Sequence, residues 1–183
     1  MHIDPKDLLP DARFIASPNC DARPDAAPPC LIVIHNISLP PNEYGGDGII
    51  ALFTNRLDPG AHPYYATIKE LKVSSHFLIR RDGELLQFVP CTQRAWHAGA
   101  STWRGRERCN DFSIGIELEG TDFEPFTEPQ YHQLAHLLCA LQAAYPIADI
   151  TGHADIAPDR KTDPGPFFDW GRIVRPISRL SLS

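Results

Sequence analysis

The chain has 183 residues, of which 43% are hydrophobic and 22% charged, and its formal net charge is −6. This composition is typical of one globular domain that buries a core without disulfide bonds. The acidic balance argues against a general nucleic-acid binder or a protein of anionic membrane surfaces, so we expect neither partner.

The cysteines are odd in number, widely spaced and without a CxxC pair: Cys20, Cys30, Cys91, Cys109 and Cys139. This pattern fits reduced thiols in a reducing compartment better than a disulfide framework. The acidic N-terminal stretch lacks the apolar segment of a secretory signal, and the apolar run at 31–34 is too short to span a bilayer. We therefore predict a cytoplasmic location.

Residues 1–29 hold six of the 18 prolines and show little periodicity, which predicts an extended N-terminal arm on the surface with at most one short helical turn. The continuous apolar run at 30–35 predicts a strand buried on both faces. Residues 37–63 are rich in Pro, Gly, Asn and Asp, with a short helix expected near 49–53. A long irregular segment of this kind is more often a binding loop than a structural accident.

Two apolar runs, 75–80 and 84–89, flank an Asp-Gly pair, which indicates a β-hairpin. The segment 113–119 alternates, so that its aliphatic residues face one way and Gly115, Glu117 and Glu119 the other.

A helix is predicted to begin after Thr127, a suitable N-cap, and to end at Pro146. Its apolar stripe is Tyr131, Leu134, Leu138, Leu141 and Tyr145. The mixture of elements predicts an α/β (mixed) fold, a central mixed β-sheet flanked by helices. Without internal repeats we expect one domain over 1–183, divided into an arm (1–29), a catalytic core (30–172) and a C-terminal tail (173–183).

The residues best suited to catalysis come from three places. His35 closes a predicted buried strand, Glu117 lies on the polar face of another, and a late polar run contains His153, Lys161 and Asp163. Zinc in hydrolytic sites commonly takes three nitrogen or oxygen ligands and leaves one position for water, which two histidines and one aspartate fit. Taken singly, each of these residues also has an ordinary structural or surface explanation.

Four strings carry a resemblance to a known family: 31–36 (LIVIHN), 94–99 (RAWHAG), 106–120 and 151–170. They resemble the N-acetylmuramoyl-L-alanine amidases related to phage T7 lysozyme and the peptidoglycan recognition proteins. The similarity is greatest to the cytoplasmic branch that acts on 1,6-anhydro-muropeptides. It implies a mixed sheet with flanking helices, one zinc ion, and cleavage between the muramic-acid lactyl group and L-alanine in recycled cell-wall fragments.

The resemblance assigns the zinc ligands to His35, His153 and Asp163. Phage-type relatives use cysteine as the third ligand, but none of the five cysteines falls in this motif. The resemblance also implies Glu117 as general base and Lys161 as the cation beside the oxyanion. Glu119 is the rival base, because strand alternation puts it on the same face.

The expected substrate is a small soluble muropeptide with carboxylates, and no obligate protein partner is expected. Arg108 lies in the motif that the family uses near the peptide, and Lys72 stands where close relatives often carry arginine. Trp96 is a candidate to stack on the sugar, and Asn36 to hydrogen-bond the amide. A core position for Trp96 and a solvated Arg108 remain open alternatives.

His76 and His97 are expected to be structural or to support the site. Three other functions stay open: a non-catalytic peptidoglycan-binding module, an amidase of intact cell wall, and a Cys–His hydrolase with Cys109 or Cys91 as nucleophile.

Overall fold

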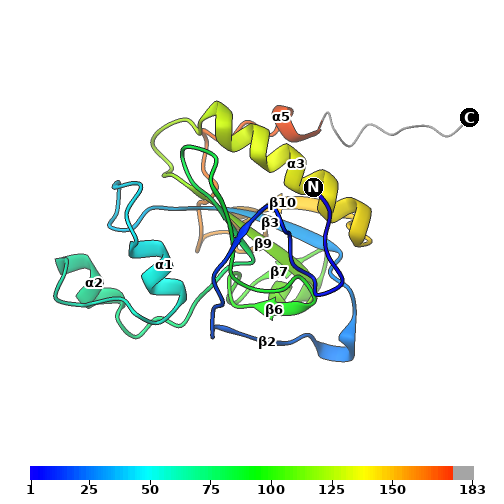
Figure 1. Ribbon diagram of the computed structural model, residues 1–183, viewed down its shortest axis with the longest axis horizontal. Helices are drawn as coiled ribbons and strands as arrows, with labels where there is room; N and C mark the ends of the chain where they lie inside the picture. Colours follow the sequence, from blue (N-terminus) through cyan, green and yellow to red (C-terminus); the bar gives the residue numbers. More distant parts are fainter. Residues whose placement is uncertain (175–183) are drawn as a thin grey trace, which may run out of the picture.

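A computed structural model describes residues 1–174, so most of the predicted C-terminal tail lies outside the described residues. At its centre is a six-stranded sheet of order β1-β5-β4-β9-β3-β10 (Figure 1). The strands are β1 (Arg13–Phe14), β3 (Leu31–Ile37), β4 (Phe77–Ile79), β5 (Leu85–Gln87), β9 (Ser113–Glu119) and β10 (Asp149–Gly152). Strands β10, β3, β9 and β4 are parallel, and β5 is antiparallel to β4, which confirms the predicted mixed sheet and the hairpin.

Strand β9 is buried at all seven positions, so its polar face is not the solvated surface that alternation alone would suggest. Its aliphatic residues join β3 and β4 in the main core under α3 (Glu128–Ala144). Ser113, Gly115 and Glu117 face the opposite side, together with His35 of β3, because paired residues of neighbouring strands project to the same face.

Helix α3 lies along one face of the sheet, at the top in Figure 1. Thr127 and Gln130 form a reciprocal capping box, which begins the helix where the sequence predicts. Four of the five stripe residues are buried in the main core, and the fifth packs against it: Tyr131, Leu134, Leu138, Leu141 and then Tyr145. The amphipathic helix is confirmed.

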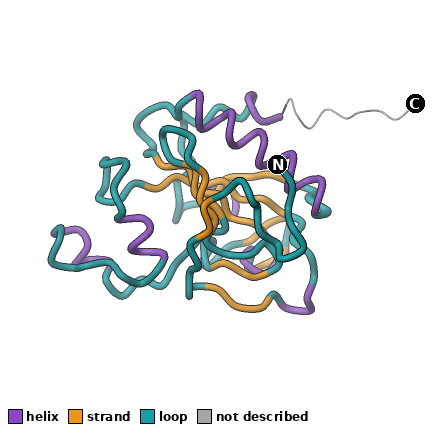
Figure 2. The backbone as a smooth tube through the Cα atoms, viewed as in Figure 1, coloured by secondary structure: helices purple, strands orange, loops and turns teal. Residues whose placement is uncertain are grey.

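The insertion after β3 folds into two short helices, α1 (Gly48–Phe53) and α2 (Pro63–Ile68), joined by loops (Figure 2). The sequence predicts the first helix but not the second. The remaining elements are β2 (Cys20–Ala22), η1 (Pro24–Ala26), β6 (Gln93–Ala95), β7 (Thr102–Trp103), β8 (Arg106–Glu107), η2 (Cys109–Asp111), α4 (His153–Ile156) and α5 (Gly171–Val174). Within residues 1–174, every helix is too short or too polar to cross a bilayer.

The N-terminal arm contains two short, mostly exposed strands and one short helical turn, η1, and both strands pair with other parts of the fold. Strand β1 pairs with β5 at the edge of the main sheet, and β2 pairs with β6. Arg23 is buried and donates to the carbonyls of Cys91, Asn110 and Ser113. The arm is therefore part of the fold. Its strand pairings and hydrogen bonds are with residues so distant in sequence that no local pattern predicts them. The boundaries at 30 and 172 stay predictions.

Candidate active site

Three neighbouring parallel strands bring the candidate residues level with one another. His35 of β3 is paired with Glu117 of β9. On the other side of β3, Ile34 is paired with Gly152 of β10, so that the next residue, His153, comes level with His35. The carboxyl ends of parallel strands are where ligand sites of such sheets form. The register thus explains why residues more than a hundred positions apart meet.

The predicted zinc ligands converge on one point. Nδ1 of His35 lies 2.9 Å from Nδ1 of His153, and each lies 3.0 Å from Oδ2 of Asp163. Both histidines are buried, with 1% and 3% of their surface exposed. Among the described residues these three make the one group of histidine, cysteine and acidic side chains close enough to share a metal ion. Two imidazole nitrogens and a carboxylate oxygen suit zinc.

The hydrogen-bond partner of His153 tests whether these residues fit a metal ion. Its Nε2 lies 3.1 Å from the carbonyl oxygen of Ala98, which can only accept. The ring proton is therefore on Nε2, and Nδ1 presents a bare lone pair toward Asp163 and His35. Lone pairs and a carboxylate that face one another repel unless a cation lies between them, so the arrangement fits a metal.

The protonation states also suit a metal site. Burial lowers the pKa of His35 to about 4, although the negative charge of Asp163 opposes this. Burial alone would raise the pKa of Asp163, but its contacts with His153 and His35 outweigh burial and lower it. At neutral pH the site therefore offers neutral imidazole and ionised carboxylate, the metal-binding forms.

Glu117 is the buried acid of the site, with 8% of its surface exposed. Its Oε2 has no hydrogen-bond partner among the described residues. Burial raises the pKa of Glu117 well above its ordinary value and the charge of Asp163 raises it further, while Lys161 opposes them. A carboxyl with a raised pKa is suited to take up and return a proton during catalysis. Lys161 is exposed and lines the same cleft.

The rival Glu119 has a structural role. Its Oε1 lies 3.2 Å from Nη1 of Arg80 and accepts from the backbone N–H of Gly45, while Oε2 accepts from that of Arg81. These bonds tie the insertion to the hairpin. Strand alternation correctly predicts the face on which Glu119 lies. Only the structure reveals that its carboxylate is paired with Arg80.

A cleft of about 480 Å³ opens over the cluster and is lined by His35, Asn36, Glu117, His153, Lys161 and Asp163. The insertion adds apolar residues to the lining, which include Phe53, Tyr64, Ile68 and Leu71. Phe123, in the loop after β9, also lines the cleft and is 80% exposed. No local pattern in the sequence links these apolar residues to His35, so the sequence does not predict their place in the cleft.

The predicted substrate-binding residues differ in position. Asn36 lines the cleft, and its Nδ2 donates to Oδ1 of Asp122 at 2.6 Å and to the carbonyl of Pro164 at 3.1 Å. It therefore orients the loop that carries the third ligand. Lys72, Trp96 and Arg108 are not part of the lining. Their contacts with substrate stay predictions.

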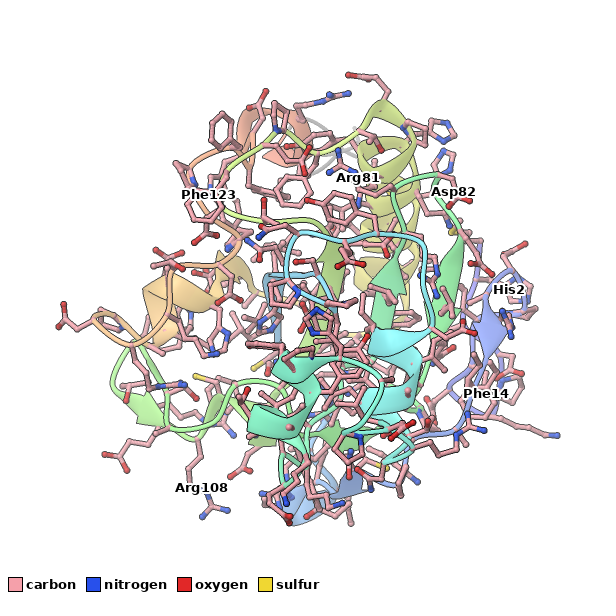
Figure 3. All side chains as sticks on the ribbon, turned by 90° about the vertical axis from the view of Figure 1, so that its left-hand side faces the viewer. His2, Phe14, Arg81, Asp82, Arg108 and Phe123 are labelled. Carbon is pink, nitrogen blue, oxygen red and sulfur yellow. The ribbon has the colours of Figure 1, made fainter. Side chains whose placement is uncertain are left out.

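Arg108 is directed to solvent. Its side chain is 70% exposed and pairs with Asp111 at 3.2 Å. In Figure 3 it lies at the lower edge of the molecule, far from Phe123 at the upper left. Lys72 is exposed as well, and Trp96 is half-buried.

The candidate cysteine nucleophiles are both buried outside the cleft lining. Burial raises the pKa of Cys91 to about 12 and also raises that of Cys109. A thiol that stays protonated is a poor nucleophile, so the Cys–His alternative is disfavoured.

A shared metal position beside a buried carboxyl and a lysine, at the floor of an open cleft, is typical of hydrolases that use one metal ion. The model of the N-acetylmuramoyl-L-alanine amidase family matches residues 25–166. The chain belongs to this family of enzymes, which confirms the resemblance and the predicted enzyme class.

Proteins similar to this chain in sequence or structure are also amidases of this kind. A 1,6-anhydro-N-acetylmuramyl-L-alanine amidase, AmpD, of Salmonella typhimurium is 62% identical over 170 residues, 92% of this chain and 91% of that protein. A crystal structure of a selenomethionine AmpD derivative has a TM-score of 0.94 at 59% identity and covers 96% and 99% of the two chains. The amidase AmiD of Escherichia coli, in complex with anhydro-N-acetylmuramic acid-L-Ala-D-γ-Glu-L-Lys, has a TM-score of 0.62 at 32% identity, over 84% of this chain and 59% of that one.

Proposed function

We propose that this chain is a zinc-dependent enzyme of cell-wall recycling in the cytoplasm. It hydrolyses the amide bond between the lactyl group of 1,6-anhydro-N-acetylmuramic acid and L-alanine in soluble muropeptides. The observation that carries the proposal is the convergence of His35, His153 and Asp163 beside Glu117. The name and the 62% identity of the Salmonella relative support the choice of bond and substrate.

The residues of the site divide the reaction between them. His35, His153 and Asp163 would hold the zinc ion, which supplies Lewis acidity and makes water a nucleophile near neutral pH. Glu117 accepts a proton from the attacking water. It then returns that proton to the amine nitrogen as the C–N bond breaks. Lys161 stabilises the negative charge that develops on the carbonyl oxygen, an effect of about 3 kcal/mol for one well-placed donor.

The cleft suits a sugar joined to a short peptide. Its apolar residues, Phe53, Tyr64, Ile68, Leu71 and Phe123, offer surface for the apolar face of a sugar ring. Trp96 adjoins the cleft-lining His97, and Lys72 lies between two lining residues. We therefore keep the proposed contacts of Trp96 with the sugar and of Lys72 with a peptide carboxylate. The contact of Arg108 with a peptide carboxylate rests on the family resemblance alone.

The test is an amidase assay with two substrates. Zinc-replete protein should release the tripeptide from anhydro-muramyl-tripeptide and act poorly on intact sacculi, and a chelator should abolish release. The substitutions Glu117→Gln and Lys161→Met should each keep one zinc per chain but lower kcat by about 100-fold or more. Glu119→Gln, on the same face of β9, is the matched control and should keep most of kcat. Release from sacculi alone, or full turnover by Glu117→Gln, would refute the proposal.

A further inference from the structure

A chain of buried hydrogen bonds lies behind His35. Its Nε2 is 3.0 Å from Nδ1 of His97, and Nε2 of His97 is 3.1 Å from the hydroxyl of Ser113. That hydroxyl donates to the carbonyl of Cys109 at 2.6 Å. His97 is 9% exposed and Ser113 fully buried, so bulk water does not compete for these bonds.

The last carbonyl fixes the direction of every bond in this chain. Because the carbonyl of Cys109 can only accept, the single proton of the Ser113 hydroxyl points to it. Ser113 then accepts from Nε2–H of His97, whose Nδ1 is left bare to accept from Nε2–H of His35. Nδ1 of His35 therefore keeps its lone pair, which faces the other two ligand atoms.

The other ligand histidine, His153, is held by Ala98, the residue that follows His97. Nε2–H of His153 donates to the carbonyl of Ala98, which also accepts from Nη2 of Arg160 at 2.8 Å. The backbone N–H groups of both His97 and Ala98 donate to Oδ1 of Asn110, at 3.1 and 2.8 Å. Two consecutive residues, anchored by one asparagine, thus contact the outer nitrogens of both imidazoles.

Strand β9 has a glycine, Gly115, where the ring of His97 packs against it. A Cβ atom on Gly115 would lie 2.5 Å from Cγ of the His97 ring. Any larger residue there would push the ring away from His35.

We propose that His97 and Ala98 form a positioning unit, in which Ser113 orients His97 so that both ligand imidazoles present Nδ1 to the metal ion. This inference rests on the zinc-dependent function proposed above. Partners of this kind lock the tautomer and ring orientation of metal-binding histidines, and their removal typically weakens metal binding about 10–100-fold. His97 acts through His35 and need not touch the substrate.

The test measures the zinc dissociation constant by competition with a chelator of known affinity. His97→Leu removes the acceptor and should weaken zinc binding about 10–100-fold. His97→Gln keeps an acceptor oxygen and should restore part of the affinity, and Ser113→Ala should weaken binding less than His97→Leu.

The matched control is His76→Leu. His76 is fully buried beside His97, with ring centroids 5.8 Å apart, but its partners are the backbone of Gly115 and Gln93 and the side chain of Arg23, 3.1 Å away. This variant should loosen the core as much as His97→Leu yet keep its zinc affinity. Equal weakening in both variants, or unchanged affinity in His97→Leu, would overturn the proposal.

A spectroscopic measurement separates this inference from the proposed function. Nitrogen-15 NMR of the histidine rings in metal-free wild-type protein should show His35, His97 and His153 protonated on Nε2. A proton on Nδ1 of His97 would overturn the positioning unit. Failure of the wild-type chain to bind zinc would contradict the proposed function, whereas the tautomer measurement would still decide on the inference.

Discussion

Glu117 is a single residue whose carboxyl destabilises the fold but suits proton transfer at the site. An unpaired buried carboxyl is destabilising, since its charged form loses water without gaining a partner. The fold nevertheless holds the Glu117 carboxyl beside His35 and in the same cleft as Asp163. A group with a raised pKa next to a metal position is expected where a proton must be taken up and returned.

The raised pKa of Glu117 gives the free energy of unfolding a defined pH dependence. Between the ordinary glutamate pKa of about 4.3 and the higher folded value, the folded state holds one more proton than the unfolded state. Stability is lost as pH rises through this window. Glu117→Gln carries no such proton, so its stability relative to wild type should increase with pH.

Urea denaturation of both metal-free proteins at pH 4.5 and pH 8 measures this difference. The advantage of the variant should be larger at pH 8, by about 1.4 kcal/mol for each unit that separates the two pKa values. A difference that stays constant with pH would contradict a raised pKa of Glu117.

At the scale of elements, the site depends on the alignment of β10, β3 and β9. The apolar run of β3, the alternation of β9 and the capping signals of α3 are local, so the sequence predicts all three. Helix α2 and strand β1 lack such signals. Helix α2 has only six residues and lies within an irregular insertion, and β1 is a two-residue strand that pairs with β5.

Gly115 tests the packing of β9 against His97. Gly115→Ala should destabilise the fold by about 1–3 kcal/mol, because the new methyl group would overlap the imidazole of His97. The backbone of a central strand cannot easily shift to relieve this overlap. It should also weaken zinc binding. Gly46→Ala is the matched control, since nothing lies within 4 Å of its added Cβ. Chemical denaturation of both variants gives the comparison, and equal stabilities would contradict this packing.

At the scale of the whole molecule, the N-terminal arm closes the fold around the site. Arg23 donates to the carbonyl of Ser113, the residue that orients His97. Its burial lowers its pKa to about 10, so it stays charged at neutral pH. The arm thus reaches the layer directly behind the ligand histidines.

Arg23→Met should lower the free energy of unfolding by about 3 kcal/mol, because the buried carbonyls of Cys91 and Ser113 and the part-buried carbonyl of Asn110 each lose a donor. Arg13→Met is the control, since the exposed pair of Arg13 with Glu84 contributes at most about 1 kcal/mol. Thermal or urea unfolding measures both. An Arg23→Met protein as stable as Arg13→Met would show that the arm is a surface appendage after all.

The whole site was predictable only in part. His35, His153 and Asp163 stand in strings that resemble the family, and the structure brings them together. The role of His97 depends on how β9 and the loop after β6 come together. The apolar residues from the insertion depend on where α2 packs. Such contacts are set by tertiary structure and leave no mark in residue spacing.

A zinc titration of the metal-free chain tests the central claim most directly. Release of tripeptide from anhydro-muramyl-tripeptide should rise linearly with added zinc and reach its limit at one equivalent per chain. His153→Ala should bind zinc far more weakly and stay inactive at that point. Full activity of the metal-free chain, or a wild-type protein that gains none with zinc, would contradict the assignment of His35, His153 and Asp163 as a catalytic zinc site.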